Sequence, residues 1–61
     1  MIMEQELAKL FDLVVQHERN PDLFNEAEMK LQRNQCLIQW PNEAYDICVR
    51  AALFAKKHPA G

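Results

Sequence analysis

The side chains best suited to chemistry in this 61-residue chain are two cysteines and two histidines. A Cys2His2 zinc site would need all four of them: His17, Cys36, Cys48 and His58. Zinc modules take two ligands from one tight turn, whereas these residues are widely spaced and form no CxxC or HxxxH pair. Both cysteines lie among apolar residues, which is typical of inert structural thiols. We therefore expect no metal and no other cofactor.

Groups that carry out catalysis are scarce. The chain contains no serine or threonine, so Tyr45 is its sole side-chain hydroxyl. A thiol–imidazole pair could act as a nucleophile only beside a cleft that holds a substrate. A chain this short buries only about 60% of its extended surface, so we expect no such cleft. The single glycine, Gly61, excludes a glycine-rich phosphate loop. We expect that the protein is not an enzyme.

Charge is distributed unevenly along the chain. The formal net charge is −2, but residues 1–28 carry two basic and seven acidic side chains, whereas residues 29–61 carry five basic and two acidic ones. One interpretation is that the two halves fold against each other and partly compensate. The alternative is a bipolar surface that steers a partner or orients two copies.

A basic strip is the main argument for nucleic-acid binding. In a dimer it would be doubled, and it would consist of Lys30, Arg33, Arg50 and Lys57. Against this hypothesis, the first turns of the last helix present Glu43 and Asp46, which phosphate would repel. A dimeric nucleic-acid-binding regulator therefore remains the alternative function.

Prolines divide the chain into the elements that position these groups. The residues preceding Pro21, Pro41 and Pro59 are disfavoured in helices, so we expect helices at about 2–19, 22–39 and 42–57. The scarcity of glycine argues against an all-β fold. The predicted fold class is all-α: a small three-helix bundle, or a helical hairpin plus a helix. Residues 36–40 could instead form a short strand.

The second helix has two apolar sides, and its start is ambiguous because Asn25 and Glu28 match a capping box, which allows a start as late as Asn25. Its main apolar stripe, expected to pack inward, comprises Leu23, Phe24, Ala27, Leu31 and Ile38. A second stripe, expected to remain outside, comprises Met29, Cys36 and Trp40. Trp40 could equally staple the second helix onto the third, and Phe24 carries the same ambiguity.

The third helix is apolar around most of its circumference, which predicts burial from several directions. Its alanine-rich side permits close helix approach. We expect this side to form a homodimer interface made of Ala44, Tyr45, Cys48, Ala51, Ala52 and Ala55.

The helices together present more apolar surface than a three-helix bundle can cover, and oligomerisation is the usual remedy in chains below about 70 residues. We therefore expect a homodimer that also binds another protein, through Phe24, Met29, Cys36 and Trp40. No signal peptide and no run of about 20 apolar residues is visible, so a cytoplasmic protein without membrane contact is expected. The predicted function is a steric regulator, inhibitor or adaptor. Phages and mobile elements encode many such proteins, which suggests an antirepressor-like role.

Overall fold

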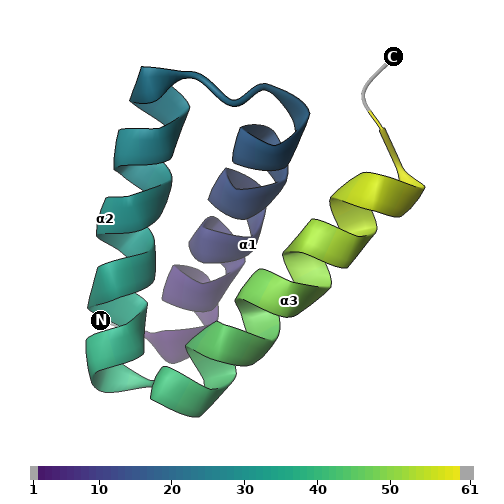
Figure 1. The fold of residues 1–61 in the computed structure, drawn as a ribbon. Helices are drawn as coiled ribbons and strands as arrows, with labels where there is room; N and C mark the ends of the chain where they lie inside the picture. The colour runs from purple at the N-terminus through teal and green to yellow at the C-terminus, as the bar shows by residue number, and fades with distance from the viewer. Residues whose placement is uncertain (1, 60–61) are drawn as a thin grey trace.

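The computed structural model describes residues 2–59 and contains three α-helices, α1 (Met3–Arg19), α2 (Leu23–Gln39) and α3 (Pro41–Lys57). The all-α fold class is confirmed, and the helix bounds lie within one residue of those expected. α1 and α3 run in the same direction, α2 runs against them, and α3 leans away from α2 towards its C-terminal end (Figure 1). Residues 36–39 are helical, so the strand alternative is wrong.

The turn between α1 and α2 is held by side-chain hydrogen bonds. Pro21 disfavours helical geometry at Asn20, and Asp22 then caps α2 by accepting a hydrogen bond from the Asn25 backbone N–H at 2.8 Å. The Asn25 side-chain amide donates to the Asn20 carbonyl at 2.9 Å. Because Asn25 already lies inside the helix, the late start suggested by the capping-box pattern is wrong.

A single residue, Trp40, joins α2 to α3. Its N–H donates to the Cys36 carbonyl at 2.7 Å, and its own carbonyl accepts from the Ala44 N–H at 2.8 Å. Pro41 follows as the first residue of α3, where its missing N–H costs no helical hydrogen bond. The Trp40 side chain is half-buried against the core, which agrees with its interpretation as a staple between the two helices.

The core lies along α1, which contacts both other helices more extensively than they contact each other. From α1 it takes Leu7, Leu10, Val14 and Val15. α3 contributes mainly alanines: Ala44, Ala51 and Ala55 are buried. Small side chains allow the α3 backbone to come close to α1, but they fill little volume themselves. α3 therefore buries its alanines and leaves several of its larger apolar side chains at the surface.

α2 turns a partly polar face towards α1. Gln32 is only 4% exposed, and its side-chain amide donates to the Glu6 carbonyl at 3.0 Å and to the Glu6 carboxylate Oε1 at 3.1 Å. The Cys36 Sγ donates to the same carbonyl at 3.7 Å. Met29 and Cys36 are buried on either side of Gln32 along the helix. These contacts determine which side of α2 faces the bundle.

This orientation reverses the expectation for α2. The stripe expected to pack inward is exposed, with Leu31 at 64% and Ile38 at 82%. Met29 and Cys36, which were expected to remain outside, are buried. The prediction failed because the two sides were ranked by apolar content. A buried glutamine whose amide is hydrogen-bonded has little desolvation cost, so the face that contains it can pack inward.

Charge placed on either side of α2 tests this orientation. Met29→Glu puts a carboxylate into the core beside Cys36, and we expect it to lower the free energy of unfolding by about 3 kcal/mol or more, enough to unfold so small a domain. Leu31→Glu, two residues away, adds the same charge at an exposed position and should leave the helical signal intact. Urea denaturation followed by far-UV circular dichroism measures both. Equal losses in the two variants would contradict the described orientation.

Candidate functional site

The most exposed apolar surface is on α2. We call it the α2 outer stripe, and it consists of Leu23, Phe24, Ala27, Leu31 and Ile38. The spacing of these residues places them on the side of the helix opposite Met29 and Cys36. Phe24 and Ile38 are 71% and 82% exposed, values unusual for side chains of this size. Nothing within residues 2–59 covers this stripe.

α3 carries a second exposed apolar stripe, the α3 outer stripe, formed by Tyr45, Val49 and Leu53. The four-residue spacing aligns these three side chains along the helix. They point away from the buried alanines that pack against α1. α2 and α3 are joined at one end by Trp40 and lie side by side in front of α1 (Figure 1). Each helix of this pair therefore carries one outer stripe.

The residues predicted to bind a partner protein do not form one surface. Met29 and Cys36 are part of the core, and Trp40 is half-buried against it. Phe24 alone among them is exposed. The exposed neighbours of Phe24 are the other members of the α2 outer stripe, which were expected to be internal.

The alanine-rich side of α3 is used within the chain. Ala44, Ala51 and Ala55 are buried, so the expectation that they form a surface for a second copy is wrong. The physical reason is that α1 occupies the close-approach side of α3. Of the other residues expected at a dimer interface, Cys48 and Ala52 are half-buried and Tyr45 is exposed. A dimer built on α3 would have to use the α3 outer stripe instead.

The basic residues do not line up as a strip within one chain. Lys30 forms an ion pair with Glu26 at 2.7 Å, which lowers the pKa of the Glu26 carboxyl below its usual value, and Arg50 pairs with Asp46 at 2.7 Å. Arg33 of α2 lies near Cys48, whereas Arg50 follows Cys48 by two residues, about 200° further around α3. Lys57 is on the same side of α3 as Arg50. The pairs Lys30–Arg33 and Arg50–Lys57 therefore face different directions.

The two thiols and two imidazoles are also dispersed. No group of three or more metal-ligating side chains is found in the part of the chain that the structure describes. Burial raises the pKa of the Cys36 thiol, and the Glu6 carboxylate adds to this increase while the Gln32 hydrogen bond opposes it. Burial also raises the pKa of Cys48, against the opposing effect of Arg33. Both groups therefore remain thiols near neutral pH.

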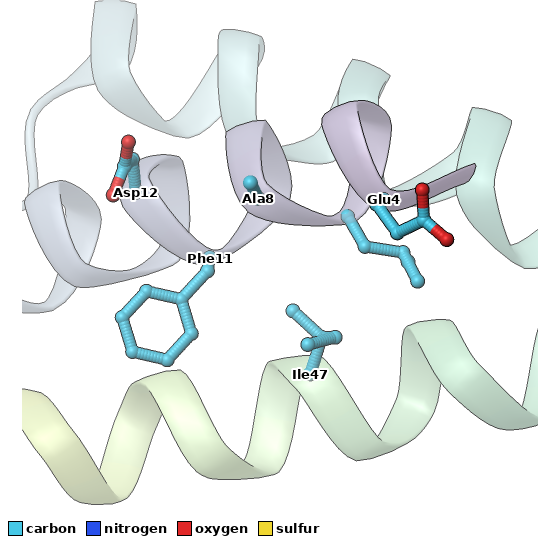
Figure 2. Close-up of a pocket in the computed structure, with 6 residues that line it drawn as sticks. Glu4, Ala8, Phe11, Asp12 and Ile47 are labelled. Atoms are coloured by element: carbon cyan, nitrogen blue, oxygen red, sulfur yellow. The ribbon is translucent and has the colours of Figure 1, made fainter. Parts of the chain in front are cut away.

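A groove that the sequence analysis did not anticipate lies between α1 and α3. It is open, has a volume of about 420 Å³ and is lined by Glu4, Leu7, Ala8, Phe11, Asp12 and Ile47. Phe11 extends from α1 and Ile47 from α3 into the space between the two helices, while Asp12, Ala8 and Glu4 follow one another along α1, with Asp12 and Ala8 further from α3 than Phe11 (Figure 2). The groove thus combines an apolar floor with carboxylates at its margin.

Beyond Phe11, the space between α1 and α3 is closed by aromatic and cationic contacts. The rings of Phe11 and Phe54 meet edge-on with centroids 5.5 Å apart, and the His58 ring lies 4.5 Å from Phe54. Arg19 covers Phe54, with its guanidinium carbon 5.9 Å from the ring centroid, and donates a hydrogen bond to the His58 carbonyl. These contacts tie the C-terminal ends of the two helices together and limit the groove to their N-terminal halves.

The sequence does contain a signal for this groove. Glu4, Ala8 and Asp12 repeat every four residues, so they share one side of α1. In that pattern, the small residue Ala8 lies between two acids and next to the apolar residues Leu7 and Phe11. The pattern does not show that α3 stops short of covering this side, because that depends on how the helices pack.

A smaller groove of about 320 Å³ lies between α1 and α2 and is lined by Lys9, Leu13, Glu28, Leu31 and Gln32. It borders the α2 outer stripe through Leu31. Its margin carries one basic and one acidic side chain, so it has no net charge preference. It therefore extends the apolar surface of α2 without adding a distinct chemistry.

Comparisons with protein-family models, with curated proteins and with solved structures find no match to this chain. Among residues 2–59, no helix has the length and apolar character needed to cross a membrane.

The two thiols should differ in reactivity. Cys36 is almost fully buried and Cys48 is half-buried, so we expect Cys48 to react first with a disulfide reagent at pH 8, and Cys36 to react only as the chain opens. Because both pKa values are raised, the rate should continue to rise above pH 9. Single-thiol variants Cys36→Ala and Cys48→Ala assign the two phases, and urea-unfolded chain gives the reference rate. Equal, fast reaction of both thiols in the folded chain would contradict this placement.

Proposed function

We propose that this chain is a protein-interaction module that pairs with a second copy through the α2 and α3 outer stripes. The observation that carries the proposal is the exposure of these large apolar side chains, in a fold whose buried core includes three alanines. Apolar surface of this extent on a small soluble domain usually marks an interface. Burial of such a side chain stabilises a complex by about 1.5–3 kcal/mol.

The arrangement of the stripes suits a two-fold axis. Both stripes belong to α2 and α3, which lie in front of α1 (Figure 1). Helical spacing places each stripe on a side turned away from the buried residues of its helix. If two such layers meet face to face around a two-fold axis parallel to the helices, the α2 outer stripe of each copy covers the α3 outer stripe of the other. Such an interface is self-complementary and closes at two copies.

The expected biological role of this module is steric. A compact helical dimer with exposed apolar side chains acts by covering a surface of a larger protein, as a cytoplasmic regulator, inhibitor or adaptor; an antirepressor-like protein of a phage would be one example. Nucleic-acid binding receives less support, because Lys30 and Arg50 are engaged in ion pairs and face different directions. We therefore place protein binding ahead of nucleic-acid binding.

Charge within the stripes should separate the copies. Ile38→Glu and Leu53→Glu each place two carboxylates in the proposed interface, one from each copy, and each should raise the dimer dissociation constant at least about tenfold. Because both positions are exposed in the single chain, helical content should be retained. Sedimentation equilibrium at low micromolar concentration measures the association. Gln16→Glu, at an exposed position of α1 and so outside both stripes, adds the same charge as a control.

Sedimentation equilibrium of the unmodified protein tests whether the dimer forms at all. A folded monomer at all concentrations tested would overturn the dimer. Association that is unchanged in both stripe variants would place the interface elsewhere. Titration with salt separates the functions, because nucleic-acid binding weakens steeply with added salt and an apolar interface responds little.

A further inference from the structure

The groove between α1 and α3 is distinct from the surface proposed for self-association. It is lined by Leu7, Ala8, Phe11 and Ile47 at its floor, and none of these belongs to either outer stripe. α1 supplies most of the lining, whereas the outer stripes lie on α2 and α3. An inference about the groove therefore goes beyond the proposed pairing and does not depend on it.

The groove has a marked charge preference. Glu4 and Asp12 are eight residues apart on α1, which corresponds to about 12 Å along the helix axis. Both are exposed, and neither forms an ion pair within residues 2–59, where the ion pairs are Lys30–Glu26 and Arg50–Asp46. No basic side chain lines the groove. A ligand that enters it meets an apolar floor between two unpaired carboxylates.

The shape of the groove favours a helical occupant. The groove runs between two helices that point in the same direction, Phe11 and Ile47 extend into the space between them, and Ala8 lies on α1 between Glu4 and Asp12 (Figure 2). A large apolar side chain can enter there, between Phe11 and Ile47. Helices recognise such grooves through side chains spaced three or four residues apart.

We propose that this groove binds a basic amphipathic helix of another protein. One bulky apolar side chain of that helix enters above Ala8 and contacts Phe11 and Ile47. A lysine or arginine about four residues before it, and another about four residues after it, reach Glu4 and Asp12. The carboxylates at both ends repel phosphate, which excludes nucleic acid from this site.

A synthetic helical peptide provides the probe. It carries lysine, phenylalanine and lysine at four-residue spacing on one side, and a matched peptide carries glutamate in place of both lysines. We expect the basic peptide to bind the full chain, measured by fluorescence anisotropy in low salt, and the acidic peptide to bind at least tenfold more weakly. Equal affinity for the two peptides, or no binding of the basic peptide at millimolar concentration, would overturn the proposal.

Variants of the chain locate the binding site. The double variant Glu4→Gln/Asp12→Asn should weaken basic-peptide binding about three- to thirtyfold, because it removes two exposed ion pairs. A control double variant, Glu18→Gln/Glu28→Gln, removes the same charge at exposed positions outside the groove and should retain binding. Equal weakening in the two double variants would mean that net charge alone attracts the peptide, which would overturn the assigned site.

Filling the groove gives a test that does not depend on charge. Ala8→Trp places a large side chain at an exposed position in the groove, so it should abolish peptide binding while leaving the circular dichroism spectrum and the sedimentation behaviour unchanged. Loss of peptide binding in Ile38→Glu but not in Ala8→Trp would show that the peptide docks on the outer stripes, and would overturn the groove assignment while leaving the proposed pairing intact.

Discussion

The hydrogen bonds of one buried amide determine which surfaces this protein presents. Gln32 donates to both the carbonyl and the carboxylate of Glu6, and Cys36 donates to the same carbonyl. An amide buried without partners would cost several times the net gain of a typical hydrogen bond, so α2 is held in the rotation that satisfies it. In that rotation the largest apolar side chains of α2 face solvent. The exposed stripe is therefore a consequence of polar satisfaction in the core.

The buried alanines of α3 also leave larger apolar side chains at the surface. Ala44 and Ala51 are fully buried and allow α3 to pack closely on α1, but they leave Tyr45, Val49 and Leu53 on the other side. A domain of this size has a small core in any arrangement, because its surface is large relative to its volume. Burial of small residues and exposure of large ones increases the apolar surface available for association. The packing that stabilises the single chain therefore also determines which apolar side chains remain at its surface.

The sequence was sufficient to predict where the helices begin and end, but not which side of each helix is buried. Pro21 and Pro41 locate the turns because their effect on the preceding residue is local. Apolar periodicity identified both sides of α2 correctly, yet it could not rank them, since the choice depends on a hydrogen bond between Gln32 and a residue 26 positions earlier. The groove was missed for a related reason. Glu4, Ala8 and Asp12 are visible as a pattern, but the space beside them exists only because of the position of α3.

The uneven charge of the chain acquires a specific meaning in this fold. If the acidic first half and the basic second half neutralised each other on folding, ion pairs would connect different helices. Within residues 2–59, however, both ion pairs are local: Lys30 pairs with Glu26 across the boundary between the two halves but inside α2, and Arg50 pairs with Asp46 inside α3. Arg19 bridges α1 and α3, but it does so through the His58 carbonyl and the Phe54 ring. Within residues 2–59, Glu4 and Asp12 of α1 are thus left without ion-pair partners beside an apolar groove, and charge that folding leaves uncompensated is available for recognition of another molecule.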